Sequence, residues 1–189
     1  MIIGLSGYAQ SGKDTIANVL VNEYGFTRIA FADKIRELLY EMDPAIEIED
    51  LQNTNYVVGL QNMVDVLGWD RAKQSQYVRS LLQNLGLGAR KVFGENHWIV
   101  EALKNIDREA NYVITDVRFV NEADWVKDVF NGILWRVKRP GVEAVNNHVS
   151  ESEMNGYKVD QILHNGGTIE DLESLVRQRM DALIANKTD

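Results

Sequence analysis

A glycine- and lysine-containing segment near the start of the sequence has the composition of a phosphate-binding loop. It reads Gly7-Tyr-Ala-Gln-Ser-Gly12-Lys13-Asp14-Thr15. Glycines let backbone N–H groups approach a phosphate chain, and a helix that follows adds the partial positive charge of its N-terminus. Lys13 is expected to reach the β- and γ-phosphates of a nucleoside triphosphate. The residues of this segment that are expected to bind the nucleotide are Gly7, Gln10, Ser11, Gly12, Lys13, Asp14 and Thr15.

The order of residues after the lysine leaves the binding of Mg²⁺ open. The common pattern places Ser or Thr directly after the lysine as a Mg²⁺ ligand. This sequence has Asp14 there and Thr15 next, and a carboxylate can bind Mg²⁺ directly or through a water. Asp116 ends a later predicted strand, where a residue of the Mg²⁺ shell often lies, although a turn or helix cap is the alternative. The metal candidates are therefore Asp14, Thr15 and Asp116.

Basic residues late in the sequence are candidates for holding the triphosphate. Arg118 follows Asp116 closely, and an arginine near the γ-phosphate would stabilise the charge of the transition state. Arg139 belongs to a basic cluster with Arg136 and Lys138 and is expected to clamp the phosphates, whereas Lys138 is better explained as solvated. Asn165 and Gly166 follow the last predicted strand and are expected to contact the base, with a plain turn capped by Thr168 as the alternative.

The middle of the sequence holds the candidates for binding a phosphoryl acceptor. Asp33, a possible catalytic base, is expected at the end of the second strand, with a helix cap as the alternative. Lys34 and Arg36 follow it. Arg79 and Gln83 are four residues apart and share a helix face, which is alternatively a solvated face. The remaining two candidates are Arg90, in a predicted glycine-bounded loop from Gly86, and Trp98, which either stacks on a base or belongs to the core.

Alternating strands and helices must position these residues. Strands are predicted at 1–6, 27–32, 111–117, 132–137 and 159–163, and helices at 12–24, 33–42, 56–67, 75–85, 96–107, 119–130 and 168–185. Short apolar strands that alternate with helices indicate a parallel sheet covered on both faces. The polar stretch 138–156 is predicted to be a mobile lid. His148 and Ser150 within it are not expected to act as a nucleophile pair, and His148 or Glu151 is expected to fix the loop.

Composition limits the classes of protein and partner. The 189 residues fit one domain, and no apolar run approaches the ~20 residues of a membrane span. The net charge of −8 disfavours binding to extended duplex DNA. The sequence has no cysteine, which excludes disulfides and suits a reducing compartment. We also see no signal peptide, so a cytoplasmic location without membrane partners is expected.

The segment Ser11-Gly-Lys-Asp-Thr15 resembles the variant phosphate-binding loop of phage-type deoxynucleoside monophosphate kinases, and the Gly-Lys-Asp variant is also similar to that of animal phosphomevalonate kinases. The resemblance covers residues 1 to about 175. The further matching segments are Phe31–Arg36, Arg79–Gly86, Ala89–Arg90, Gly94–Trp98, Asp116–Glu122, Arg136–Gly141, His148–Glu151 and Asn165–Thr168. One departure is Gly86-Leu-Gly88, where the family more often has Gly-Thr and an acidic residue.

The resemblance implies a single α/β domain over residues 1–189. Its fold would be the three-layer α/β/α P-loop fold, with about five parallel strands in the order 2-3-1-4-5. A helical region at about 33–110 would bind the acceptor, and the lid would lie at about 138–156. For a phage-encoded protein, the location would be the host cytoplasm.

The activity that this resemblance implies is phosphorylation of a deoxynucleoside 5′-monophosphate to the diphosphate, with ATP and Mg²⁺. The acceptor phosphate is itself a good nucleophile, so no general base is required. One alternative is a kinase for another small phosphorylated acceptor, or for a hydroxymethylated pyrimidine in DNA with Asp33 as base. A second alternative is a non-catalytic nucleotide-binding switch. Base preference, discrimination between deoxyribose and ribose, and oligomeric state are left open by the sequence.

Overall fold

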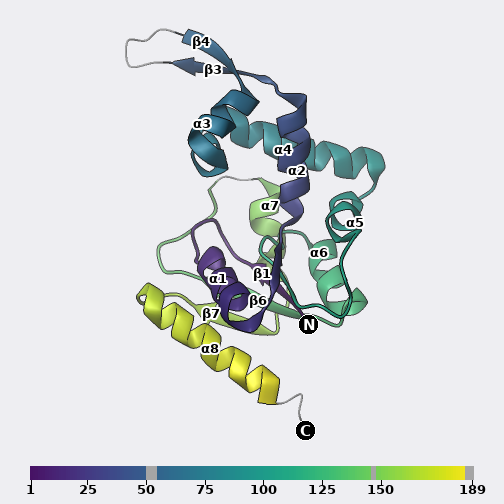
Figure 1. Ribbon diagram of the computed structural model, residues 1–189, viewed down its shortest axis with the longest axis vertical. Helices are drawn as coiled ribbons and strands as arrows, with labels where there is room; N and C mark the ends of the chain where they lie inside the picture. The colour runs from purple at the N-terminus through teal and green to yellow at the C-terminus, as the bar shows by residue number, and fades with distance from the viewer. Residues whose placement is uncertain (50–54, 146–147, 186–189) are drawn as a thin grey trace. The chain divides into compact units, whose positions relative to one another are not determined.

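The chain folds into two compact units. A computed structural model describes residues 1–49, 55–145 and 148–185. The first unit comprises Met1–Ala30 and Lys104–Asp189, and the second comprises Phe31–Leu103 (Figure 1). Among the described residues, no helix is long and apolar enough to cross a membrane.

A parallel sheet forms the centre of the first unit. Its strands are β1 (Ile2–Ser6), β2 (Thr27–Ile29), β5 (Tyr112–Ile114), β6 (Ile133–Lys138) and β7 (Gln161–His164). They are parallel and lie in the order β2-β5-β1-β6-β7. Counted along the chain, these strands give the order 2-3-1-4-5, so the predicted topology is confirmed.

Helices cover both faces of this sheet. On one face, α1 (Lys13–Tyr24) and α8 (Ile169–Ala185) pack side by side over a core that includes Ile3 and Leu5 (Figure 1). Gly4 points to the other face, where an added Cβ would lie 3.0 to 3.2 Å from Leu134, Val117 and Val126. Because strand side chains alternate between faces, the apolar run of β1 is buried on both. The predicted three-layer α/β/α arrangement is therefore confirmed.

The helix predicted at 119–130 is divided into two parts. The first is α6 (Val120–Asp124), and the second is the π-helix η1 (Trp125–Val129). The N–H of Phe130 donates to Trp125 O at 3.2 Å, a five-residue spacing. The carboxylate of Glu122, 4% exposed, accepts from the backbone N–H of Arg118 and Phe119 and so caps α6. This cap fixes the backbone at Arg118, shortly after β5.

Within the residues of the second unit that the structure describes, the chain forms four helices and a hairpin. The helices are α2 (Phe31–Met42), α3 (Leu60–Ala72), α4 (Gln76–Phe93) and α5 (His97–Leu103). The antiparallel hairpin is formed by β3 (Ala45–Glu49) and β4 (Asn55–Gly59). Its core buries Leu39, Ile46, Leu60, Ala72 and Val78.

Three predictions for this unit are wrong. The helix predicted from residue 56 begins at Leu60, because residues 55–59 pair with β3 instead. The strand predicted to reach residue 32 ends at Ile29, so Asp33 lies in the first turn of α2 and not at a strand end. Arg90 lies within α4 and not in a loop. Gly86 lies inside this helix, and its lack of a side chain allows close packing against α2, because a Cβ there would lie 3.2 Å from Ile35 Cδ1.

The segment after β6 contains short helices of its own. They are α7 (Val149–Ser152) and the 3₁₀ helix η2 (Glu153–Gly156). Nδ1 of His148 accepts from the backbone N–H of Ser150 at 3.2 Å and so caps α7. This contact agrees with the expectation that His148 fixes the loop, while its opening and closing as a lid remain a prediction.

Candidate functional site

The loop between β1 and α1 has the backbone conformation that its glycines predict. The φ angles of Gly7, Gln10 and Gly12 are 136°, 62° and 108°, and such positive values favour glycine. A Cβ at Gly7 would lie 2.5 Å from Val137 O, and one at Gly12 would lie 2.6 Å from Asn165 Nδ2. Helix α1 begins directly afterwards at Lys13. The loop therefore presents its peptides at a helix N-terminus, the arrangement that suits a phosphate.

Two side chains of this loop are suited to a phosphate ligand. The ammonium of Lys13 donates to the carbonyl oxygens of Gly7 and Tyr8, at 2.8 and 2.7 Å. Ser11 is 1% exposed, and its Oγ has no hydrogen-bond partner among the described residues. A buried hydroxyl without a partner is unfavourable, so a ligand oxygen that reached it would be stabilised.

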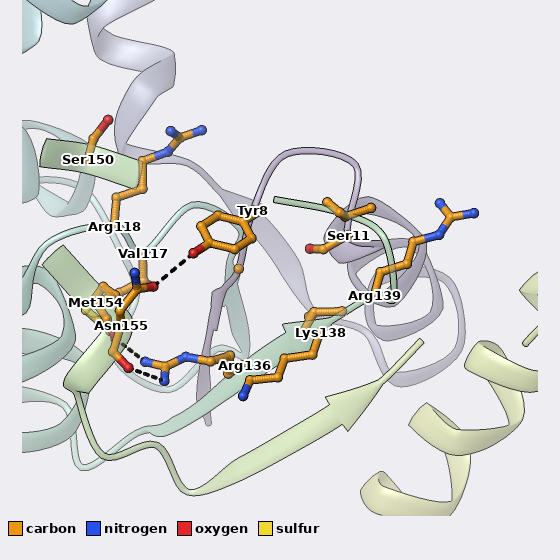
Figure 2. A pocket seen from close by; sticks show the side chains of 13 residues that line it. Tyr8, Ser11, Val117, Arg118, Arg136, Lys138, Arg139, Ser150, Met154 and Asn155 are labelled. Carbon is orange, nitrogen blue, oxygen red and sulfur yellow. Dashed lines mark hydrogen bonds between the residues drawn. The ribbon is translucent and has the colours of Figure 1, made fainter. Parts of the chain in front are cut away.

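A cavity of about 360 Å³ lies beside this loop (Figure 2). Loop residues line one part of it, and the end of β6 with the residues that follow lines another. Its lining residues are Gly7, Tyr8, Ser11, Val117, Arg118, Arg136, Val137, Lys138, Arg139, Val142, Ser150, Met154 and Asn155. Four of them are cationic, which makes the cavity suited to an anion although the chain is acidic overall.

Arg118 and Arg139, the two candidates for holding a triphosphate, both line this cavity. In the view of Figure 2, they lie on opposite sides of the loop that carries Tyr8 and Ser11. Arg139 Nη1 also donates to Gln10 O at 3.3 Å, across a sequence separation of 129 residues. The structure thus brings Arg118 and Arg139 to the loop that contains Gln10 and Ser11.

Arg136 has a different part in this cavity. Its guanidinium donates to the carbonyl oxygens of Met154, of Asn155 at 3.4 Å and of Tyr157 at 3.1 Å. Burial lowers the pKa of Arg136 from its ordinary value. The residue therefore ties helix η2 to strand β6, a structural function that the grouping with Lys138 and Arg139 did not suggest. No local pattern could reveal it, because the partners are backbone groups 18 to 21 residues away.

Tyr8 and Asn155 are further cavity residues that the sequence did not reveal. The hydroxyl of Tyr8 donates to Asn155 Oδ1 at 3.3 Å, and Figure 2 shows the ring reaching from the loop toward Asn155. Tyr8 occupies a variable position of the phosphate-binding pattern, so its type carried no signal. The contact joins the loop to the segment that was predicted to be the lid.

The three metal candidates offer oxygen ligands from the start of α1 and from the segment just after β5. Asp14 is exposed in the first turn of α1, and Thr15 beside it is half-buried. Asp116 is half-buried, two residues after β5, which pairs with β1. Mg²⁺ prefers such hard oxygen ligands and commonly uses only one or two protein groups together with phosphate oxygens and water. The types of these residues therefore fit Mg²⁺.

Asn165 lies beside the loop, but its amide is used within the protein. The residue is 9% exposed, and its Nδ2 donates to Ser11 O at 2.8 Å. Gly166 is exposed next to Pro140. Thr168 and Asp171 exchange hydrogen bonds between side chains and backbone, at 2.9 and 3.2 Å, so they cap α8. The cap at Thr168 agrees with the alternative of a plain turn.

The second unit places six of its seven candidates on helices α2 and α4. Asp33 and Arg36 form an ion pair at 2.8 Å on α2, and Lys34 pairs with Glu37. The positions of Arg79, Gln83 and Arg90 fall on one face of α4, because spacings of four and eleven residues complete nearly whole helical turns. Arg79 Nη2 donates to Lys73 O at 3.2 Å.

Trp98 belongs to the interior of the second unit. It is 4% exposed, and its indole N–H donates to Gly86 O at 2.9 Å. A buried indole with a satisfied N–H is poorly placed to stack on a base. This environment favours the core interpretation that the sequence left open.

Three features together define a P-loop phosphotransferase. They are the parallel sheet of order 2-3-1-4-5, the loop with Lys13 between β1 and α1, and the cationic cavity beside this loop. The family model for deoxynucleotide monophosphate kinases matches residues 61–176. The chain is also 31% identical, over 195 residues and 96% of each chain, to a protein of Acanthamoeba polyphaga mimivirus that carries the name deoxynucleotide monophosphate kinase. The chain belongs to the deoxynucleotide monophosphate kinase family.

Solved structures of other kinases are similar to this chain at low identity. Shikimate kinase from Aquifex aeolicus is 12% identical with a TM-score of 0.47, over 99% of this chain and 98% of that one. Dephospho-CoA kinase from Campylobacter jejuni is 15% identical with a TM-score of 0.45, over 98% of each chain.

Proposed function

We propose that this protein transfers the γ-phosphoryl group of ATP to a deoxynucleoside 5′-monophosphate and forms the diphosphate, with Mg²⁺. Family membership supports the reaction class. The observation that carries the proposal is the meeting of the phosphate-binding loop with Arg118 and Arg139 around one cavity in the first unit. A site of this kind neutralises the charge of a triphosphate on several sides, which is the main requirement of phosphoryl transfer.

On the donor side, each residue has a separate task. Lys13 would exchange its bonds to the loop carbonyls for bonds to β- and γ-phosphate oxygens. Ser11 Oγ would donate a hydrogen bond to the phosphate chain, and Arg118 would stabilise charge on the transferred group. Asp14, Thr15 and Asp116 would hold Mg²⁺, which when bound neutralises charge on the β- and γ-phosphates.

On the acceptor side, the proposed residues lie in the second unit. Arg79 and Arg90 would bind the monophosphate from one face of α4, and Gln83 between them would contact the base. Lys34 and Arg36 on α2 would add positive charge. The acceptor phosphate is already ionised and attacks without losing a proton, so Asp33 would orient Arg36 through their ion pair and is not needed as a base.

Transfer from labelled ATP to a panel of acceptors tests the proposal. The panel contains the deoxynucleoside and ribonucleoside 5′-monophosphates and DNA with hydroxymethylated pyrimidines, each with and without Mg²⁺. We expect labelled deoxynucleoside diphosphates in the presence of Mg²⁺. Label in the DNA and none in the mononucleotides would contradict the proposal and favour the DNA-kinase alternative, in which Asp33 acts as base. Binding of ATP without transfer to any acceptor would favour a nucleotide-binding switch.

A further inference from the structure

Asn165 connects three parts of the first unit. Its backbone N–H donates to the carbonyl oxygen of Lys138, the last residue of β6, at 2.8 Å. Its side-chain amide is buried and donates to Ser11 O at 2.8 Å. The same amide lies against Gly12, where an added Cβ would be 2.6 Å from Nδ2. The end of β7 is thereby fixed to both the phosphate-binding loop and the end of β6.

The bond to Ser11 O determines which way one peptide of the loop faces. In a planar trans peptide, the C=O and N–H groups point in opposite directions. Because Asn165 holds the carbonyl of Ser11, the N–H of Gly12 is directed away from Asn165. Gly12 has φ 108° and ψ 12°, and glycine tolerates other backbone conformations at little cost. Without an outside contact, this peptide would be able to rotate.

A rotated peptide would harm a phosphate site directly. It would replace the N–H donor of Gly12 with the carbonyl oxygen of Ser11, and that oxygen would repel phosphate oxygens. The Nδ2 of Asn165 stabilises the orientation that keeps this carbonyl outside. It forms its bond in a buried place where water competes little.

We propose that Asn165 is a positioning residue that holds the Ser11–Gly12 peptide in its phosphate-binding orientation, and that its amide does not read the nucleotide base. The inference rests on the proposed use of ATP at this loop. It assigns Asn165 to the triphosphate end of the donor site, through the loop, although the sequence suggested the base end.

Two partial ligands separate these assignments. Inorganic tripolyphosphate carries the phosphates without a base, and adenosine carries the base without phosphates. Their dissociation constants, with those of ATP and GTP, are measured by calorimetry for the parent, Asn165→Asp and Asn165→Ala. The Asp variant keeps the shape of Asn and loses the donor. Asn22→Asp makes the same chemical change at an exposed position of α1 and is the matched control.

We expect Asn165→Asp to weaken the binding of ATP and of tripolyphosphate about tenfold or more. The affinity for adenosine and the ratio of the ATP affinity to the GTP affinity should stay unchanged. Asn165→Ala, which adds no charge, should show the same selectivity with a smaller loss. Weaker binding of adenosine with unchanged binding of tripolyphosphate would overturn the inference in favour of base recognition by Asn165. A changed ratio of ATP to GTP affinity would do the same. Unchanged affinities in both variants would overturn it too.

Two further measurements distinguish a local effect on the loop from a loss of folding or of donor binding. The melting temperatures of the variants should stay close to that of Asn22→Asp. An equal weakening of all four ligands together with a lowered melting temperature would assign Asn165 a purely structural function, against the inference. If the parent protein binds tripolyphosphate and ATP no better than adenosine, the proposed donor function itself fails. That result requires only the parent protein, so failure of the proposed donor function can be distinguished from failure of the inference about Asn165.

Discussion

The ammonium of Lys13 lies 2.7 Å from the carbonyl oxygen of Tyr8, within the loop that is proposed to bind phosphate. A carbonyl is a neutral acceptor, whereas a phosphate oxygen is negatively charged, so the ammonium gains an additional attraction between opposite charges when it binds phosphate. A bound triphosphate would therefore compete successfully for the lysine. The contact gives the side chain a defined position before the nucleotide arrives.

Replacing Lys13 with Ala should lower the turnover of phosphoryl transfer at least ~10³-fold, because a positive charge next to the transferred group is lost. The protein should still fold, since the ammonium donates to two carbonyls of its own loop. The measurement is the transfer rate at saturating substrates, with circular dichroism as a check of folding. Lys158→Ala, at an exposed position, is the control. Activity within tenfold of the parent would rule out the proposed function of Lys13.

Asp14→Asn should raise the Mg²⁺ concentration needed for half-maximal activity, because an amide is a weaker Mg²⁺ ligand than a carboxylate. Binding of ATP without metal should change little. The measurement is a Mg²⁺ titration of the transfer rate at fixed ATP. Asp128→Asn changes an exposed carboxylate elsewhere in the same unit and should leave the titration unaltered. If Asp14→Asn gives the same curve as this control, Thr15 or Asp116 must hold the metal.

Arginines in the two units should differ in the kinetic step that they affect. Arg79→Ala and Arg90→Ala should each raise KM for the mononucleotide about tenfold or more, since a charge-assisted contact contributes roughly 1.5–3 kcal/mol. KM for ATP should stay nearly constant, and slow ATP hydrolysis without acceptor should persist. Arg118→Ala should instead lower kcat for transfer and hydrolysis together. Steady-state kinetics with each substrate varied in turn measure the difference, and equal losses at all three positions would refute the division into acceptor and donor residues.

Arg136→Met should destabilise the protein, because it leaves the carbonyl oxygens of Met154, Asn155 and Tyr157 without their cationic donor. We expect a loss of about 2–4 kcal/mol in the free energy of unfolding. Arg136→Lys should recover only part of it, since an ammonium lacks the planar fork of a guanidinium. Denaturant unfolding provides the measurement. Arg108→Met, at an exposed position, controls for the loss of an arginine, and a midpoint equal to that of this control would be evidence against the structural function.

The stability of the protein should depend on Tyr157 at alkaline pH. Burial, and then the hydrogen bond to Asp124 Oδ1 at 2.7 Å, raise the pKa of Tyr157 to about 12. A raised pKa stabilises the fold fully below the pKa of an unfolded tyrosine, about 10, and this contribution is lost as the pH rises through about 12. Melting temperatures from pH 8 to 11 should therefore fall more steeply above pH 10 for the parent than for Tyr157→Phe. Parallel curves would show that the phenol does not have this raised pKa.

The parts of the fold that could be predicted are those with local signals. The apolar runs that became β1, β5 and β6 are recognisable without their partners, as is the glycine pattern between β1 and α1. The order of the strands came from the resemblance, since no local feature encodes it. The hairpin of β3 and β4 had a usable signal, because Ile46 and Ile48 alternate with Glu47 and Glu49. The helical spacing that follows obscured it.

The site residues that could be predicted are those whose side-chain type and position alone indicate their chemistry. Lys13, Arg118 and Arg139 follow from charge and position, and the structure places all three at the loop or the cavity. Tyr8 and Asn165 depend instead on which backbone or side-chain group lies opposite them. That information arises only when segments about 150 residues apart come together, so no sequence spacing could supply it.

The central position of β1 has a consequence for how the chain reaches this structure. Its neighbours in the sheet, β5 and β6, begin more than 100 residues later. On a ribosome, residues 2–6 emerge before either partner strand and find both only after about residue 138 has been made, so the phosphate-binding loop should acquire its shape late. The unit Phe31–Leu103 has its partners close by in the chain and is free to fold earlier. The phosphate-binding site, although made before β5 and β6, is therefore expected to be among the last parts to form.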